Sequence, residues 1–417
     1  MGDPVVIVGG GPAGTSTALC LREAGLDSVI VERDDFPRFH IGEAITGSAG
    51  KLLRRLGLGD ALLAQGHAVK RGAFVVGTNG KNAFRVPAVD VLEDGTRQET
   101  WTWQLWRQDF DKLLLDTAVE RGAQLVHATA EDVTRGSDGR VDGVVVRHRD
   151  GGRATIRAAA VVDAAGPRCF LHRLGLTSEK ERGKYDAQIA VYGHLVGADR
   201  DPDGTIGDDR NDTVMLYTSQ LHWAWFIPVR DDIVSVGIVV PTSTYRAARQ
   251  SPTEFFLSQL ETMNPALAAR TRQATLLRPV ETCANYSYRI REFAGNGWLC
   301  VGDSHRFVDP FFAFGVHHAL FEGRMAADAL ARYVANGRVE ELLDYQQRAD
   351  DAQDIVQDLV DAFWNAPLAF GYLITKKHRD DIIDIFAGRI YDLDEPSPGL
   401  AALRRINASA LMAGAPT

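Results

Sequence analysis

Cysteine is scarce in this sequence, and its spacing excludes the usual chemistry of paired cysteines. The 417 residues hold four cysteines, Cys20, Cys169, Cys283 and Cys300, and no two of them form a C-x-x-C pair. That spacing argues against both a zinc site and a redox disulfide. Cys20 and Cys300 lie in apolar segments, which is typical of buried thiols. We therefore expect no metal site and a reducing, cytoplasmic location.

Long apolar runs and an excess of basic residues are also missing. No stretch approaches the roughly 18 apolar residues of a membrane helix, and no charged and apolar leader precedes the short run at 5–8. We expect neither a membrane span nor a signal peptide. The net charge is -9, from 46 basic and 55 acidic residues, which argues against nucleic acid as the main partner. Docking to another protein needs only a local charged patch and stays compatible with this charge.

What is present begins with a strand, a glycine-rich loop, a helix and a second strand within the first 32 residues. Residues 4–8 and 28–32 are short β-branched runs that predict buried parallel strands. Residues 15–24 have helical composition, and the glycine that follows ends the helix. The loop reads Gly9-Gly-Gly-Pro-Ala-Gly14. This order is typical of a dinucleotide-binding βαβ unit.

The glycines of that loop have separate predicted roles. Gly9 permits the tight turn, Gly11 lets a diphosphate approach the backbone, and Gly14 lets helix and strand pack closely. The helix N-terminus offers free N–H groups to the diphosphate. Glu32, at the end of the second strand, can accept hydrogen bonds from the adenosine ribose, and we group the adjacent Arg33 with it. The alternative is a glycine turn without a ligand, which the flanking strands, helix and acidic residue disfavour.

Two later segments favour FAD over NAD. Residues 298–303, which end in Gly302-Asp303, resemble the strand that brings an aspartate to the flavin ribityl chain in many FAD proteins. The segment that starts at Arg107 resembles the helix start whose arginine supports the phosphate side of the flavin. A solvated arginine at a helix start is the alternative for Arg107.

The whole chain predicts an α/β (α+β) fold. It comprises a Rossmann-like FAD-binding domain, an inserted antiparallel β-sheet substrate domain and a short helical C-terminal segment. Alternating runs that indicate the inserted sheet lie at 189–197, 213–218, 222–229 and 233–240. The predicted boundaries are 1–75, 98–186 and 283–335 for the FAD-binding domain, 76–97 and 187–282 for the sheet, and 336–417 for the C-terminal segment.

Four local expectations complete this outline. They are a helix over 52–63, a strand over 100–105, a helix over 109–121 with Asp109 as its N-cap, and a helix over 354–365 that Pro367 ends.

Four motifs carry a family resemblance. They are the loop Phe36-Pro-Arg-Phe-His-Ile-Gly-Glu43, the W-x-W-x-I-P match Trp223-Ala-Trp-Phe-Ile-Pro228, Lys70 at the entrance of a strand, and Asp309-Pro-Phe-Phe-Ala-Phe-Gly-Val-His317. With the glycine loop, they resemble the FAD-dependent halogenases, a family within the p-hydroxybenzoate-hydroxylase-like flavoproteins. The resemblance covers most of residues 1–330.

The resemblance implies a reaction and roles for its residues. Reduced FAD from a separate flavin reductase, oxygen, and chloride or bromide would give hypohalous acid. Lys70 would be the catalytic lysine that hydrogen-bonds this acid or forms a haloamine, because a buried amine loses its proton readily. Trp223 and Trp225, at i and i+2 on one strand face, would separate the flavin from the substrate. The alternatives are a surface lysine and a packed aromatic pair.

The chain departs from the family at the turn Pro310–Gly315. The family usually has two hydroxyl residues before the glycine, and the backbone N–H groups there hold the halide; this chain has Ala313 and Phe314. The backbone donors survive the change, although the Phe314 ring could crowd a halide. The acidic residue that tryptophan-type members carry before this turn is absent. The resemblance is therefore to members that act on phenols or pyrroles, some of them carried by acyl-carrier proteins.

Three functions are compatible with these residues. They are an aromatic halogenase of natural-product biosynthesis, a halogenase-like FAD monooxygenase or dehydrogenase that has lost its halide site, and a non-enzymatic flavoprotein. For the halogenase, Glu43 is the candidate acid–base group, and the basic run 376–379 is a candidate docking face for an acidic carrier protein. The expected partners are an aromatic small molecule or a carrier-tethered substrate and a flavin reductase, with no nucleic acid and no membrane.

Overall fold

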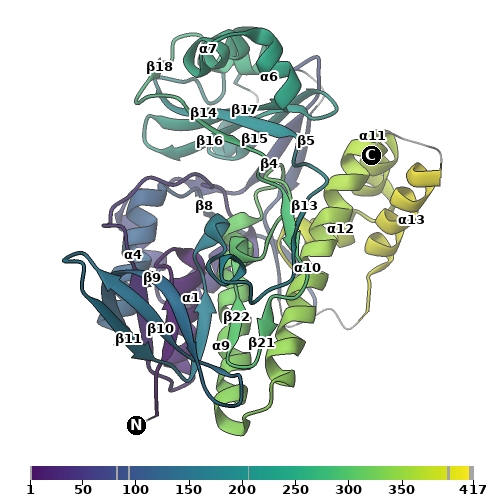
Figure 1. Ribbon diagram of the computed structural model, residues 1–417. Helices are drawn as coiled ribbons and strands as arrows, with labels where there is room; N and C mark the ends of the chain where they lie inside the picture. Colours follow the sequence, from purple (N-terminus) through teal and green to yellow (C-terminus); the bar gives the residue numbers. More distant parts are fainter. Residues whose placement is uncertain (1, 81–82, 93, 205, 392–394, 413–417) are drawn as a thin grey trace.

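Two large β-sheets and a group of long helices build the molecule. The computed structural model describes residues 2–80, 83–92, 94–204, 206–391 and 395–412. One sheet lies above the other in Figure 1, and the long helices α9 (Gly315–Asn336) and α10 (Glu340–Asn365) run beside the lower sheet.

The lower sheet has a parallel centre and antiparallel edges. Strands β9, β2, β1, β12 and β22 are parallel neighbours, and β10, β11 and β21 extend the edges antiparallel. In sheet order the strands are β11 (Arg153–Arg157), β10 (Val141–His148), β9 (Gln124–Arg135), β2 (Ser28–Glu32), β1 (Val5–Val8), β12 (Ala160–Asp163), β22 (Trp298–Cys300) and β21 (Ala294–Gly295). Strands β1, β2 and β12 are buried along their whole length, as apolar β-branched strands of a parallel sheet are. Helix α1 (Pro12–Glu23) packs against both α4 (Arg107–Glu120) and α9.

The upper sheet is antiparallel except at one pair. In order its strands are β18 (Thr275–Leu276), β14 (Gln188–Val196), β17 (Ile233–Pro241), β16 (His222–Arg230), β15 (Thr213–Ser219), β4 (Gly72–Val76) and β5 (Ala83–Pro87), with β19 (Glu281–Ala284) also on β14. The pair β4–β15 is parallel, so the expectation of a wholly antiparallel sheet is wrong there. The boundary drawn after residue 75 falls inside β4, and the domain limits stay predictions.

The two faces of the upper sheet pack into different cores. Trp223 and Trp225 belong to the core shared with the lower sheet, whereas Ala224 and Phe226 pack with α7 (Pro252–Thr262) and α8 (Pro265–Thr271). This alternation follows from the two-residue period of a strand. The prediction that the two tryptophans share a face is confirmed.

Smaller elements connect the two sheets. Three small sheets pair β13 (Lys180–Arg182), β20 (Tyr288–Ile290) and β23 (Arg306–Phe307); β3 (Val69–Lys70) and β8 (Thr102–Trp103); and β6 (Val89–Val91) and β7 (Arg97–Glu99). The remaining helices are α2 (Gly47–Arg55), α3 (Gly59–Ala64), α5 (Phe170–Arg173), α6 (Thr242–Ala248), α11 (Pro367–Tyr372), α12 (Arg379–Phe386) and α13 (Pro398–Met412), with a π-helical turn at Leu373–Lys377.

Three of the four local expectations are corrected, and one is confirmed. The helix predicted over 52–63 is two helices, because Gly57 adopts a φ of +73° that ends the first. Helix α4 starts at Arg107 after the N-cap Trp106, so Asp109 lies in the first turn, where its charge still suits the helix dipole. The strand predicted over 100–105 is only β8. The prediction that Pro367 ends the helix over 354–365 is confirmed, because that segment belongs to α10, which ends at Asn365. Pro367 also opens α11, since proline suits a first helical position.

Within the described ranges, no helix combines the length and the apolarity that a membrane crossing needs.

All four cysteines are free; Cys20, Cys169 and Cys300 are buried and Cys283 is exposed. The prediction that Cys20 and Cys300 lie in the core is confirmed.

Candidate active site

The glycine loop forms a tight cradle at the start of α1. Gly9 has a φ of +114°, and a Cβ there would lie 2.4 Å from the Ala164 carbonyl oxygen. A Cβ on Gly14 would lie 2.0 Å from the Gly9 carbonyl oxygen. Gly11 is the N-cap residue and carries no side chain to cap the helix. The first N–H groups of α1 are therefore available to a diphosphate.

Glu32 is fixed at the end of β2 by backbone donors. Its carboxylate accepts hydrogen bonds from the N–H groups of Gly10 at 2.7 Å and of Arg33 and Asp34 at 2.8 Å. A carboxylate has further lone pairs for ribose hydroxyls. The Arg33 side chain is exposed and pairs with Asp34, so it is not brought into the cradle.

Two arginines lie by the 36–43 loop, and they differ in what they contact. Arg107 is buried and makes two bonds to the Asp111 carboxylate, at 2.7 and 2.9 Å, and also donates to the carbonyls of Ile41 and Gly42. Arg107 therefore holds this loop. Arg38 reaches the glycine loop, because its Nη2 lies 3.4 Å from the point where a Cβ on Gly11 would be. Its buried Nε has no hydrogen-bond partner among the described residues, which suits a phosphate of a bound cofactor.

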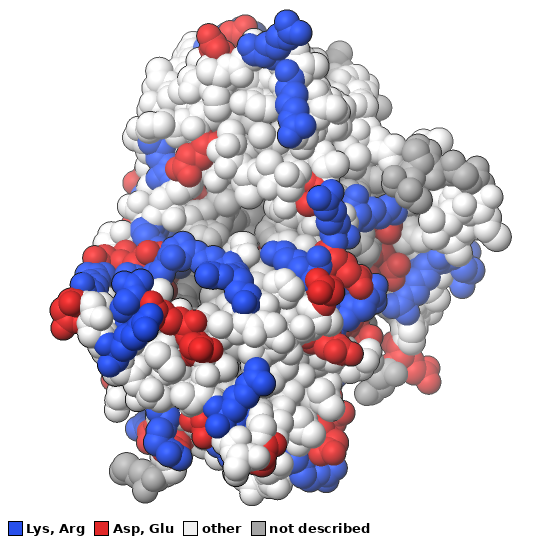
Figure 2. All heavy atoms as spheres, viewed as in Figure 1, with Lys and Arg blue, Asp and Glu red and all other residues white. Residues whose placement is uncertain are grey.

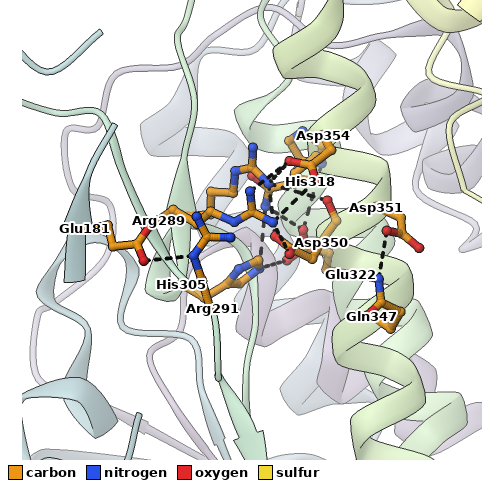
Figure 3. Close-up of polar contacts among 12 residues, drawn as sticks. Glu181, Arg289, Arg291, His305, His318, Glu322, Gln347, Asp350, Asp351 and Asp354 are labelled. Carbon is orange, nitrogen blue, oxygen red and sulfur yellow. Dashed lines mark hydrogen bonds and ion pairs between the residues drawn. The ribbon is translucent and has the colours of Figure 1, made fainter. Parts of the chain in front are cut away.

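Asp303 lies in the turn that follows β22, and a buried network holds this turn. Burial, with the nearby charge of Glu322, raises the pKa of Asp303 to about 7. The Glu322 carboxylate accepts from the Gly302 N–H at 2.6 Å, lies 2.8 Å from His305 Nε2, and accepts from Gln353 at 2.8 Å. Figure 3 shows His305 and Glu322 directed toward each other.

The charge state of Glu322 follows from these neighbours. Burial alone would raise its pKa, but the electrostatic interaction and hydrogen bond with His305, aided by His318 and Gln353, hold the pKa below its ordinary value. The flavin-side turn is therefore attached to an ionised carboxylate in the core.

Lys70 is buried at the end of β3. Its Nζ donates to the Ile45 carbonyl at 3.1 Å, and the side chain is 8% exposed. Burial lowers the pKa of the amine to about 8, although Asp212 opposes the shift. Asp212 also accepts from the N–H groups of Arg71 and Gly72, at 2.6 and 2.8 Å, and so fixes the link between β3 and β4.

Glu43 and His194 form a buried acid–base pair. Glu43 Oε1 lies 2.6 Å from His194 Nε2, and both side chains are buried. Glu43 Oε2 and His194 Nδ1 have no partner among the described residues. Glu43 is two residues before Ile45, the carbonyl partner of Lys70. His194 packs against Trp106 with ring centroids 4.8 Å apart.

The tryptophan face and the 310–315 turn meet through Phe311. The rings of Trp223 and Trp225 lie 5.9 Å apart, and Trp223 contacts Phe311 edge-on at 4.9 Å. The Trp225 indole N–H donates to Ser235 at 3.1 Å. Pro310 precedes Phe311 in the turn, and its carbonyl accepts from the Ala313 N–H at 3.0 Å.

The same turn opens α9. Ala313 has a φ of +59° and Phe314 is the N-cap residue, with no side-chain cap on the helix that begins at Gly315. The ring of Phe314 packs on His317 and His318, with centroids 5.6 and 5.8 Å away, and so lies against the helix. The first N–H groups of α9 are available to an anion.

The surface supports a charged ligand between the sheets. Figure 2 shows a hollow between the upper and lower parts of the molecule, with Lys and Arg side chains gathered along its lower edge. Positive charge around a hollow favours a diphosphate. Among the described residues, no group of three or more His, Cys, Asp or Glu side chains is placed to hold a metal ion.

Comparison with known proteins decides the family. The FAD binding domain family matches residues 3–362. A 1H-pyrrole-2-carbonyl-[peptidyl-carrier protein] brominase of Pseudoalteromonas luteoviolacea is 36% identical over 392 residues, which cover 94% of this chain and 93% of the relative. The chain belongs to the FAD-dependent halogenase family. The halogenase is also 28% identical to a 1H-pyrrole-2-carbonyl-[peptidyl-carrier protein] chlorinase of Pseudomonas fluorescens, over 93% of this chain and 89% of that one.

A solved structure agrees. The flavin-dependent brominase Bmp2 matches with a TM-score of 0.91 and 33% identity, over 99% of each chain. The protein is therefore a flavin-dependent halogenase, an FAD-dependent oxidoreductase.

Sequence reasoning missed two residues of this halogenase site. Arg38 lies in the 36–43 motif. Nothing in the sequence indicates that Arg38, rather than Arg33, lies beside the glycine loop. His194 is 151 positions from Glu43, and only the alternation of β14 placed it on the inner face. No sequence pattern pairs residues so far apart.

Proposed function

We propose that this halogenase brominates or chlorinates an electron-rich ring of the pyrrole or phenol type that a carrier protein presents as a thioester. The observation that carries the proposal is that two relatives matching over nine-tenths of the chain are named for pyrrole-2-carbonyl groups on a peptidyl-carrier protein. A separate flavin reductase would provide the reduced cofactor.

The residues of the cradle fit FAD. Gly9, Gly11 and Gly14 would leave room for the diphosphate, Glu32 would accept hydrogen bonds from the adenosine ribose, and Asp303 would contact the ribityl chain. Arg38 offers its Nε, which has no hydrogen-bond partner among the described residues, while Arg107 holds the adjoining loop. When bound, reduced FAD and oxygen supply the oxidising equivalents that convert a halide to hypohalous acid.

The backbone at Phe314 and Gly315 is the proposed halide site. The N-terminus of α9 attracts an anion without any hydroxyl side chain. The Phe314 ring lies against His317 and His318, and this packing supports a halide at the backbone despite the loss of the family's hydroxyl residues.

We propose that Lys70 directs the halogen and that Glu43 accepts the ring proton. At pH 7 an amine with a pKa of about 8 is mostly protonated, so Lys70 can donate a hydrogen bond to hypohalous acid. The ring carbon then forms its bond to the halogen as the halogen–oxygen bond breaks, the leaving hydroxyl takes a proton from Lys70 to become water, and the ring proton is taken up by a base. We assign the uptake of that proton to the buried Glu43–His194 pair.

The test is halogenation of a pyrrole-2-carbonyl thioester on a peptidyl carrier protein, with chemically reduced FAD, oxygen and either bromide or chloride. We expect a product heavier by one halogen in place of hydrogen. Lys70→Ala should abolish it while FAD binding persists, and Glu43→Gln should slow it. Unchanged halogenation by Lys70→Ala would refute the role of Lys70.

A further inference from the structure

An exposed apolar surface follows the end of α10. Leu368 on α11 is 91% exposed, the highest value among the large apolar side chains of the described residues, and Tyr372 is 57% exposed. They stand four residues apart and so share one helix face. The opposite face is buried through Phe370 and Leu373. An exposed apolar pair on a firmly packed segment marks an interaction surface.

Basic side chains continue this surface. Lys376 follows Tyr372 by four residues at the π-helical turn, and Lys376 and Lys377 are exposed. In the described part of the chain no carboxylate lies within ion-pair distance of either lysine; the ion pairs in this stretch are those of His378 with Asp381 and of Arg379 with Asp380. The whole chain carries a net charge of -9, so this unpaired positive charge is local and favours an acidic partner.

The same helix walls a cavity. The cavity has a volume of about 400 Å³, and its walls are β4, β5, β15, the end of α10, and α11. Its lining residues are Val75, Ala83, Phe84, Tyr217, Phe363, Pro367, Phe370 and Gly371. Helix α11 therefore carries exposed residues of the surface and also lines the cavity.

Ring contacts connect the wall of the cavity with the tryptophan face. Phe363, in its wall, contacts Phe311 with ring centroids 4.7 Å apart, and Phe311 contacts Trp223 at 4.9 Å. Phe363 and Phe311 thus link the wall of the cavity to Trp223. Such a path suits a narrow, flexible arm that ends in an aromatic ring.

We infer that α11 and the π-helical turn dock the acidic carrier protein that presents the substrate. Leu368 and Tyr372 contact the carrier, Lys376 and Lys377 pair with its carboxylates, and the thioester arm passes through the cavity toward Trp223. A free aromatic substrate would need the cavity alone and would leave the apolar and basic surface without a use. The inference rests on the proposed carrier-tethered substrate.

The experiment compares two forms of one substrate. The pyrrole-2-carbonyl group is supplied on a peptidyl carrier protein and, separately, as a free pantetheine thioester. For Lys376→Glu/Lys377→Glu we expect the KM for the carrier form to rise at least tenfold, with turnover of the free thioester unchanged. Arg246→Glu/Arg272→Glu is the matched control, because it reverses two exposed charges on α6 and beside α8.

The outcomes separate docking from function. If the parent enzyme halogenates the carrier form and the double lysine variant does so with the same KM, docking at α11 is wrong. Equal losses on both substrate forms would show a structural defect and would also overturn it. If the parent enzyme accepts only the free ring, the carrier-tethered function itself fails. A parent dimer that Leu368→Ser converts to a monomer in sedimentation would assign the surface to a second copy.

Discussion

At the scale of single residues, the burial of Lys70 lowers the free energy of unfolding. Its pKa is about 8 in the folded chain, against an ordinary value of 10.5. Between these pH values the Lys70 amine is protonated in the unfolded chain and mostly neutral in the folded chain. Stability therefore rises with pH across this window, and the full loss of stability is present below pH 8. The cost is on the order of 3 kcal/mol.

Lys70→Met should therefore raise the free energy of unfolding at pH 7 by up to about 3 kcal/mol. The gain should shrink toward zero as the pH approaches 10.5. Urea unfolding at pH 7, 8.5 and 10 measures both effects. Lys51→Met serves as the control, because Lys51 is exposed and its replacement should change stability little at any pH. A gain that is the same at every pH would contradict the assigned pKa.

Residue-scale prediction from the sequence succeeded where a role depends on the backbone and failed where it depends on a distant partner. The steric need for Gly9 and Gly14 follows from the loop motif itself, and the structure places backbone atoms where their Cβ atoms would be. The Glu43–His194 pair, by contrast, joins residues 151 positions apart, and no local motif encodes it.

At the scale of elements, the local sequence pattern predicted most strands and helices, but it did not predict where each one ends or which strands pair. The alternation of β14, β15, β16 and β17 was readable because one face differs from the other in the core it joins. The parallel pairing of β4 with β15 joins segments about 140 positions apart, and no local period encodes it.

The junction of β22 with α9 and α10 supports a second prediction. His305→Ala would leave the buried Glu322 carboxylate without its hydrogen-bond partner at 2.8 Å, and leaving a buried charge without a partner costs about 3–5 kcal/mol. Glu322→Gln should cost less, because it removes the buried charge and keeps an acceptor for the Gly302 N–H. Chemical denaturation compares the two variants, and FAD titration should show weaker binding by His305→Ala. If Glu322→Gln is the more damaging change, the network does not hold an ionised carboxylate.

At the scale of the whole molecule, FAD would lie between two sheets whose strands come from distant parts of the chain. A ligand that binds only the folded state stabilises it by about 2.7 kcal/mol at a concentration 100 times its Kd. We expect FAD to raise the Tm of the parent protein in a concentration-dependent way. Gly14→Val should abolish this rise, because the added Cβ would lie 2.0 Å from the Gly9 carbonyl oxygen. Gly25→Ala is the control: it has open space around its Cβ but a φ of +78°, so it should lower the Tm modestly while the FAD-dependent rise persists. A Gly14→Val protein that FAD still stabilises would place the cofactor away from α1.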